Sequence, residues 1–353
     1  MRPLMLVLTS AAVALACQDH STPTSAVPDG AHFAVSDPRF LLPNDAGATA
    51  GYEVIRLDMG GLESYAVDIN NQSAVAGGAY RDGTFEAFVW KNGTLEFLGT
   101  LGGEFSFANA ISDAGAVTGV SSTAAGEYHA FIWRPARGME DIGAGEGWGI
   151  NADEVVVGFS GSTAFRWTAA TGMVELPALP GGYDSFAFDI NNAGVAVGSS
   201  ADATGRHAVR WVTDGSAPQD LGTLGGDYSQ ARAIADNGVI VGTSTTASYL
   251  AAFRWTPSAG MEPLSGPGVA GQAVGVSAAG AVGGRFRFNP PPHRPGTVPP
   301  NYETQCLWPS DGGCRPIAKF NGALSAINDS GVIAGVLETA GPYGFAAVLW
   351  RRE

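Results

Sequence analysis

Histidine and carboxylate side chains are the groups in this chain best suited to metal binding or acid–base chemistry. His129 and His207 occupy the same place in two internal repeats, and imidazole is a common metal ligand and general base. The two repeats are not adjacent, and the repeat between them has Thr163 at this place. We therefore expect both histidines to be surface or edge-strand residues, and we expect no metal ion or other cofactor.

Aspartate and asparagine recur in the first turn of six of the seven repeats, at Asn70, Asp113, Asp153, Asn191, Asp236 and Asp329. Their oxygens could suggest calcium, but no stretch has the D-x-[DN]-x-[DN]-G spacing of a calcium loop, and turn formation explains them. Asp68 and Asp189 precede a recurring Ile, near the expected channel of the fold. Neither has a base or nucleophile beside it, so we expect no catalytic residues.

The first sixteen residues are typical of an export signal. Arg2 precedes a mainly apolar run at 4–16, and a run of thirteen residues is too short to span a bilayer, which needs about 20. Residues 14–17 (ALAC) resemble the lipobox of bacterial lipoproteins. That resemblance implies that Cys17 is lipidated, becomes the mature N-terminus and anchors the chain to the outer membrane or cell surface. Secretion without an anchor is the alternative.

The number of cysteines is consistent with export and lipidation of Cys17. If Cys17 carries lipid, Cys306 and Cys314 remain as a pair that can form a disulfide in an oxidising compartment. Two unpaired thiols are the alternative. Residues 17–51 are rich in Ser, Thr, Pro and Asp without sustained periodicity, which predicts a flexible tether.

Residues 52–353 contain one motif seven times. In each copy an apolar residue is followed eight positions later by Gly and then by a Trp, namely Trp90, Trp133, Trp167, Trp211, Trp255, Trp308 and Trp350. Each unit of about 43 residues divides into four short strands, which is the size of a propeller blade. The sequence predicts an all-β fold, a seven-bladed β-propeller. An N-terminal strand at 52–59 would complete the last blade, which otherwise ends at its third strand.

Alternation along the strands predicts how the blades pack. In the third strand, Phe and Trp share one face and an Ala occupies the other. In the first strand, Ser and Ala share one face, and Ile shares the other with an aromatic such as Phe107 or Phe186. We expect the bulky face of each blade to insert into the small face of its neighbour.

The repeats resemble the HAF family of extracellular repeats, named for His-Ala-Phe before x-Trp. Residues 129–133 (HAFIW) are a full copy, and 207–211 (HAVRW) are a near copy. The linker LGTLGG at 98–103 recurs at 221–226. The resemblance covers 52–353 and implies an exported β-repeat protein, but it implies no defined activity or catalytic residue.

The sixth repeat contains a Pro-rich insertion at 289–303, directly after the basic-aromatic segment 285–288 (RFRF). In a propeller, the loops after the second and fourth strands share one rim, and aromatic and Arg side chains are enriched in recognition surfaces. We predict a ligand-binding rim containing Phe105, Trp148, Tyr183, Tyr228, Arg285, Arg287, Phe288, His293, Arg294 and Tyr302. The alternative is a tolerated insertion pinned by the disulfide.

A function class follows from these features. The net charge of −14 argues against a nucleic-acid partner. We expect an exported, membrane-tethered, monomeric module that binds or scaffolds a protein or glycan of the envelope or the extracellular space. One alternative is a hydrolase or lyase acting on polysaccharide or lactone at a channel site. A structural repeat with no small ligand is another.

Overall fold

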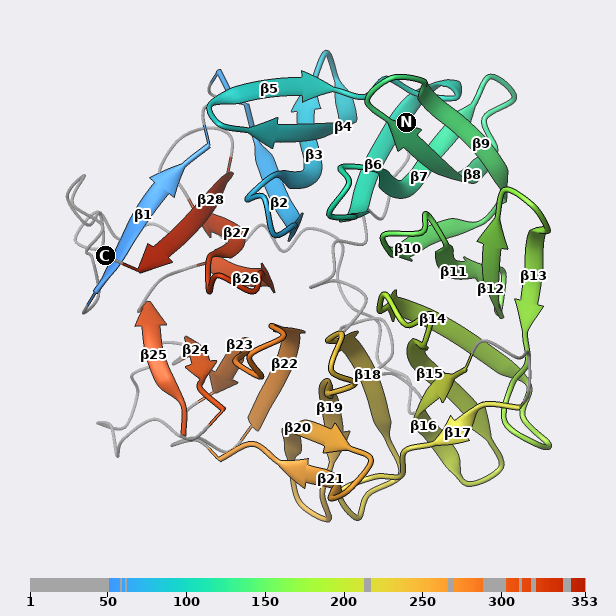
Figure 1. The fold of residues 1–353 in the computed structure, drawn as a ribbon, viewed down its shortest axis with the longest axis vertical. Helices are drawn as coiled ribbons and strands as arrows, with labels where there is room; N and C mark the ends of the chain where they lie inside the picture. Colours follow the sequence, from blue (N-terminus) through green and yellow to red (C-terminus); the bar gives the residue numbers. More distant parts are fainter. Residues whose placement is uncertain are drawn as a thin grey trace, which may run out of the picture. The chain divides into compact units, whose positions relative to one another are not determined.

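The computed structural model describes residues 51–57, 59–60, 62–212, 217–265, 270–287, 303–310, 313–318, 322–338 and 344–352. In these residues the chain forms seven four-stranded antiparallel sheets arranged as the blades of a β-propeller (Figure 1). This confirms the predicted fold class. No helix in this part of the chain has the length and hydropathy of a membrane span.

Each blade runs from an inner first strand to an outer fourth strand (Figure 1). The first strands are β2 (Ser64–Ile69), β6 (Gly102–Ile111), β10 (Glu146–Ile150), β14 (Asp184–Ile190), β18 (Ser229–Ile234), β22 (Ala270–Val276) and β26 (Gly322–Ile327). The second strands are β3 (Val75–Arg81), β7 (Val117–Thr123), β11 (Val156–Ser160), β15 (Ala196–Asp202), β19 (Ile240–Thr245), β23 (Val282–Arg287) and β27 (Ile333–Glu338).

The Phe-x-Trp motif lies in the third strands, and the outer strands are shorter. The third strands are β4 (Thr84–Lys91), β8 (Tyr128–Arg134), β12 (Thr163–Thr168), β16 (Gly205–Trp211), β20 (Leu250–Thr256), β24 (Glu303–Trp308) and β28 (Phe345–Arg352). The fourth strands are β5 (Thr94–Phe97), β9 (Gly138–Ala144), β13 (Gly172–Leu176), β17 (Gln219–Asp220), β21 (Gly260–Pro263), β25 (Arg315–Ala318) and β1 (Tyr52–Arg56). Blades 1 to 7 are numbered from β2, so blade 7 contains β26, β27, β28 and β1.

The ring is closed by β1, the first strand in the chain. It pairs antiparallel with β28, from Tyr52 opposite Arg352 to Arg56 opposite Val348. An ion pair of 2.8 Å between Arg351 and Glu53 lies along the same pair of strands. The prediction that the N-terminal strand completes the last blade is therefore confirmed.

Small residues of one blade receive bulky residues of the next. At the interface of blades 1 and 2, Phe131 and Trp133 pack in one cluster with Ala76 and Ala87. Phe131 and Ala87 are fully buried. The same pairing recurs around the ring and gives one hydrophobic cluster at each interface. The core is thus divided among the blade interfaces, as the alternation in the third strand predicts.

Serine hydroxyls add polar contacts at four of these interfaces. The first-strand serine five residues before the recurring Ile accepts a hydrogen bond from the backbone N–H of the third-strand alanine in the preceding blade. The bonds run from Ala87 to Ser106 (2.9 Å), Ala164 to Ser185 (2.9 Å), Ala208 to Ser229 (2.7 Å) and Ala347 to Ser64 (3.1 Å). A buried N–H that would otherwise lack a partner is thereby satisfied.

A β-bulge in every first strand corrects the predicted alternation. The pairing with the second strand skips one residue in each blade, as between Ala108 and Ala110. One extra residue reverses the face of everything beyond it. Ile111 therefore lies in the same cluster as Ala108, which corrects the prediction that the Ile and the Ala of the first strand lie on opposite faces.

The repeated Gly of the motif lies opposite this bulge. In blade 1, a Cβ on Gly77 would overlap the carbonyl oxygen of Tyr65 in the neighbouring first strand. The same overlap with a first-strand carbonyl would occur at Gly119, Gly158, Gly198, Gly242, Gly284 and Gly335. Close approach of the backbone, and not a special φ angle, therefore explains why the motif has Gly at this place.

The turns between first and second strands form one rim, which we call the turn rim. They cover residues 70–73, 112–115, 151–154, 191–194, 235–238, 277–280 and 328–331. The second residue of a turn donates its backbone N–H to the side-chain oxygen of the second residue in the turn of the next blade. The bridges run from Asn71 to Asp113 (2.9 Å), Ala152 to Asn192 (2.8 Å), Asn192 to Asp236 (2.8 Å), Ala278 to Asp329 (2.6 Å) and Asp329 to Asn71 (2.9 Å).

Two interfaces lack this bridge, and in both the receiving turn has an alanine, Ala152 or Ala278. Replacing both with Asn should supply the missing acceptors and raise the free energy of unfolding by about 1–2 kcal/mol. Urea unfolding of the double variant A152N/A278N measures this. The matched control, A114N/A279N, changes the neighbouring exposed turn positions and should leave stability within about 0.5 kcal/mol. Equal effects of the two double variants would contradict the bridging role.

Candidate functional site

His129 and His207 each pair with an aspartate on the fourth strand of their own blade. His129 Nδ1 lies 2.8 Å from Asp141 Oδ2, and His207 Nδ1 lies 2.8 Å from Asp220 Oδ2. Each aspartate also accepts the backbone N–H of the Gly two residues further on, Gly143 (2.8 Å) or Gly222 (2.7 Å). The pairs hold the short outer strands β9 and β17 to the third strands.

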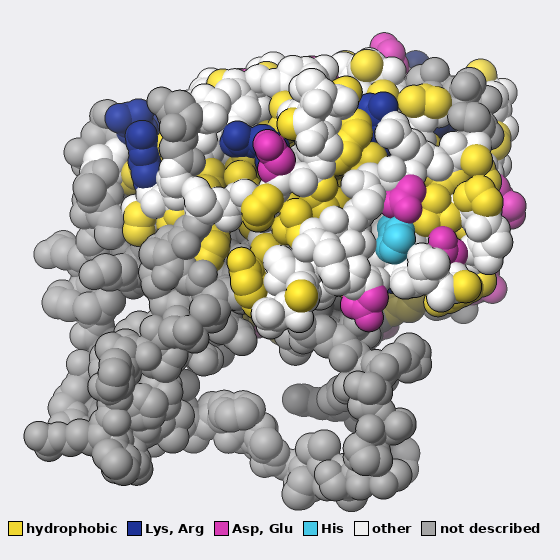
Figure 2. Space-filling view, turned by 90° about the horizontal axis from the view of Figure 1, so that it is seen from below, with side chains coloured by type: hydrophobic (Ala, Val, Ile, Leu, Met, Phe, Trp, Pro, Cys, Tyr) yellow, Lys and Arg dark blue, Asp and Glu magenta, His cyan; other side chains and the backbone are white. Residues whose placement is uncertain are grey.

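Both histidines lie on third strands and not on the outer edge strands, with side chains only 20% and 15% exposed, which corrects their expected position at the surface or on an edge strand. Figure 2 shows a histidine beside an acidic side chain on the wall of the ring. Within the described part of the chain, no three His, Cys, Asp or Glu side chains converge as a metal site requires. Both blades with the His carry Asp-x-Gly in the fourth strand, at 141–143 and 220–222, and this sequence signal could have found the partners.

Asp68 and Asp189 bind backbone groups across blade interfaces. Asp189 accepts the N–H of Ile190 at 2.8 Å and that of Ile234, in the next blade, at 2.8 Å. Asp68 does the same with Ile69 (2.8 Å) and Ile111 (2.9 Å). Each carboxylate thus uses both oxygens to hold the first strands of two adjacent blades together.

Burial makes ionisation of these carboxylates unfavourable. It raises the pKa of Asp189 to about 7, against the opposing effect of the two amide hydrogen bonds, and the negative charges of Asp68 and Asp236 add to the increase. Burial likewise raises the pKa of Asp68. A carboxyl group with a pKa near 7 could exchange protons, but here both oxygens are engaged by the backbone.

An aromatic cluster that the sequence analysis missed lies on the inner strands of blades 3 to 5. Trp148, the bulge residue of β10, lies against Phe159 (ring centroids 5.9 Å apart) and Phe188 (5.7 Å). The Arg232 guanidinium lies 5.0 Å from the Phe188 ring centroid and 5.8 Å from that of Trp148. Trp148, Phe188 and Arg232 hold the bulge position in three consecutive blades, so the bulges bring them together.

Glu146 adds a carboxylate to this cluster. It accepts a hydrogen bond from Trp148 Nε1 at 3.2 Å. Burial raises the pKa of Glu146, and the Trp148 hydrogen bond partly opposes the increase. A carboxyl group beside aromatic rings is an environment that favours the protonated form.

The rim opposite the turns, which we call the loop rim, carries exposed tyrosines. It contains the connections after the second and fourth strands of each blade. Four of the six exposed large hydrophobic side chains in the described residues lie at strand ends on this rim. They are Tyr80 (39% exposed), Tyr128 (42%), Tyr183 (74%) and Tyr249 (50%).

The residues predicted for a binding rim are therefore only partly brought together. Tyr183 is exposed on the loop rim, and Tyr228 is half-buried there, with its hydroxyl 3.4 Å from Gln230. Phe105 and Trp148 are each only 8% exposed, which corrects their expected place on the surface. Trp148 turns inward because of the bulge, and Phe105 packs against Tyr128 with ring centroids 5.8 Å apart.

The basic part of the predicted rim is described only at its start. Arg285 Nε donates to Gln272 Oε1 at 2.7 Å within blade 6. Arg287 ends β23, and the position of its side chain is not described. Phe288, His293, Arg294 and Tyr302 lie outside the described residues, so the role of the insertion stays a prediction.

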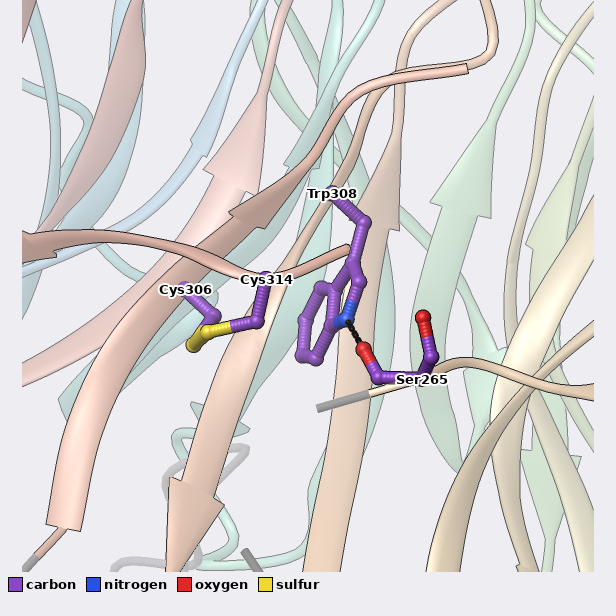
Figure 3. The surroundings of a disulfide bond; sticks show 4 residues. All are labelled: Ser265, Cys306, Trp308 and Cys314. Carbon is purple, nitrogen blue, oxygen red and sulfur yellow. Dashed lines mark hydrogen bonds between the residues drawn. A yellow bond between two sulfur atoms is a disulfide. The ribbon is translucent and has the colours of Figure 1, made fainter. Parts of the chain in front are cut away.

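Cys306 and Cys314 form a disulfide between β24 and the approach to β25, with Cα atoms 5.4 Å apart (Figure 3). Nearby, Trp308 Nε1 donates to the carbonyl oxygen of Ser265 at 2.7 Å, which ties blade 6 to the end of blade 5 (Figure 3). The disulfide fastens the outer strand of blade 6, the blade that carries the insertion.

Comparison with known proteins supports the architecture. No family model and no curated protein matches the chain. A catalytically inactive virginiamycin B lyase from Staphylococcus aureus is similar in structure, with a TM-score of 0.58 and 10% identity, over 84% of this chain and 99% of that chain. At such identity the likeness shows the fold alone.

Two archaeal structures show the same fold-level likeness. The β-propeller domain of the Trilobed protease from Pyrococcus furiosus has a TM-score of 0.53 at 12% identity, over 83% of this chain and 94% of that domain. The Pyrococcus horikoshii acylaminoacyl peptidase has a TM-score of 0.50 at 14% identity, over 82% of this chain and 52% of that one. The Trilobed protease domain has an open velcro topology, whereas β1 closes the ring here.

The raised pKa of Asp189 makes a prediction about stability and pH. Its folded-state pKa lies above the ordinary value, so the folded protein binds the proton more tightly than the unfolded chain between about pH 4 and 7. Its contribution to stability is complete below about pH 4 and is lost as the pH rises through about 7. Asp189→Asn, which cannot ionise, should therefore destabilise the protein by about 3 kcal/mol more at pH 4.5 than at pH 8.

Urea unfolding of the wild type and D189N across this range measures the difference. Asp189→Ala should follow the same pH trend with a larger loss at every pH, because it also removes the acceptor for Ile234. A constant difference between wild type and both variants from pH 4.5 to 8 would show that Asp189 stays ionised.

Proposed function

We propose that this chain is an exported binding module that takes its ligand on the loop rim. The observation that carries the proposal is the set of exposed tyrosines on that rim, Tyr80, Tyr128, Tyr183 and Tyr249. Tyrosine gives a large contact area at low entropic cost and is enriched in recognition surfaces. The opposite rim is engaged in bridging the blades.

The buried carboxylates support binding over catalysis. Asp68 and Asp189 each use both oxygens to hold backbone N–H groups. His129 and His207 are paired with aspartates that also fasten an outer strand. These groups have structural partners that account for their position, so catalysis is not needed to explain them.

The export part of the proposal is supported by the disulfide. Bonds such as Cys306–Cys314 persist in oxidising compartments and are rare in the cytosol. Together with the apolar run ahead of Cys17, this supports export and attachment to a membrane through a lipid on Cys17. Residues 18–51 would then separate the propeller from the membrane surface.

A second candidate function is favoured by Glu146. Its pKa is raised by burial beside Trp148, which is the environment of a general acid. The similar structure of virginiamycin B lyase shows that a propeller of this size can be an enzyme. A hydrolase or lyase acting on polysaccharide or lactone would use this carboxyl group. Turnover of such a substrate by the wild type that is lost in E146Q would favour this candidate.

The tyrosine rim is tested by removing two of its rings. The variant Y183A/Y249A should capture at least about fivefold less ligand than the wild type on arrays of peptides and envelope glycans, because each ring contributes contact area. The control V174A/V212A removes two other exposed apolar side chains, 50% and 39% exposed, from outside this rim. Unchanged capture of every probe by Y183A/Y249A would refute the proposal.

The anchor is tested by Cys17→Ser. Without the thiol no lipid can be attached, so the protein should move from the membrane fraction to the soluble exported fraction, with the propeller intact. Fractionation followed by immunodetection measures this, and Cys306→Ser/Cys314→Ser serves as the control that keeps the anchor. Membrane association that persists in C17S would contradict the proposed attachment.

A further inference from the structure

We propose that the partner of the loop rim is a Lys- and Arg-rich polypeptide segment, which binds along the rim of blades 2 to 5. The inference rests on the proposed binding function and names the chemistry of its ligand. It is carried by the arrangement of acidic and aromatic side chains on this part of the rim.

Blade 2 holds the most compact part of the arrangement. Glu104 precedes Phe105 near the start of β6, and Glu127 precedes Tyr128 at the start of β8 in the same blade. The Phe105 and Tyr128 rings lie 5.8 Å apart at an interplanar angle of 81°. Glu104 is exposed, and the Glu127 side chain is 74% exposed. Two carboxylates in solvent thus flank an aromatic pair with one exposed ring.

Blade 5 repeats the combination with Asp227 and Tyr228. Asp227 is exposed, and Tyr228 directly follows it at the start of β18. The ring of Tyr249, which is 50% exposed, lies at the start of β20 in the same blade. Tyr183, in blade 4, continues the row of exposed rings between the two acidic sites.

The charge of this part of the rim is one-sided. The strand ends and connections of blades 2 to 5 on this rim carry the acids Glu104, Glu127, Asp184, Asp202 and Asp227, and the basic residues Arg206, His129 and His207. Arg206 is already paired with Asp184 at 2.6 Å. Glu127 Oε2 lies 3.8 Å from His129 Nε2, and this histidine is also paired with Asp141 at 2.8 Å, so the carboxylates on this part of the rim still outnumber the basic groups beside them.

Carboxylates and aromatic faces attract the same kind of ligand. A cation over an aromatic ring gains about 0.5–1 kcal/mol at an exposed site, and neighbouring carboxylates add a Coulombic attraction. Polyanions are repelled by this surface, and a neutral glycan makes no use of its charge. The acidic sites lie on different blades, so one small cation cannot contact them all. A chain with cations at intervals can do so.

The test uses purified full-length protein and a fluorescent decalysine peptide, with decaglutamate as the opposite charge. Fluorescence anisotropy should show binding of decalysine that weakens at least tenfold between 50 and 300 mM salt, and no binding of decaglutamate. The variant E104Q/E127Q should raise the Kd for decalysine about tenfold. Tyr128→Ala should raise it about threefold, and Tyr128→Phe, which keeps the ring, should restore it.

A charge-matched control separates the rim from the net charge of the protein. The variant E96Q/D153N removes two exposed acids from β5 and from the turn rim, and should change the Kd less than twofold. Equal effects of the two double variants, or decalysine binding that is no tighter than decaglutamate binding, would overturn the inference. If capture of neutral glycans depends on Tyr183 and Tyr249 while decalysine does not bind, the proposed binding function is supported. The inference that the partner is cationic is then wrong.

Discussion

Each blade depends on the absence of a side chain at one position. The Gly that follows the recurring apolar residue by eight positions lies against a carbonyl oxygen of the first strand, where a Cβ would overlap it. This contact is next to the bulge that shifts the pairing of that strand in all seven blades. The bulge moves the Ile into the blade interface. The residue at the bulge itself supplies the cluster of Trp148, Phe188 and Arg232, so both the interfaces and this cluster depend on the bulge.

The interfaces combine apolar packing with a small number of repeated polar contacts. Aromatic residues of one blade fill space beside the alanines of the preceding one, and serine, asparagine and aspartate side chains satisfy backbone N–H groups across the gap. Where the turn has alanine, other contacts cross the interface. Arg134 of blade 2 binds Glu154 of blade 3 at 2.8 Å, at an interface that lacks the turn bridge.

The spacing of Gly and Trp was sufficient to predict seven blades and their closure, because each blade repeats the same local contacts. The bulge could not be predicted from alternation, since one extra residue leaves no trace in a short strand. Trp148 was therefore expected at the surface, although it is packed against Phe188. Tyr183 could be placed on the loop rim from topology alone. Glu146 was missed because its hydrogen bond with Trp148 forms at the β10 bulge, which was not foreseen.

Closure by β1 has a consequence for the order in which the chain can mature. This strand is synthesised first among the described strands, yet its partner β28 is the last, with Tyr52 opposite Arg352. A growing chain therefore carries an unpaired strand edge until nearly every residue has been made, and ring formation must wait for the C-terminus. Any chain cut short by premature termination would lack the strand that receives β1, and would expose that edge to aggregation or proteolysis.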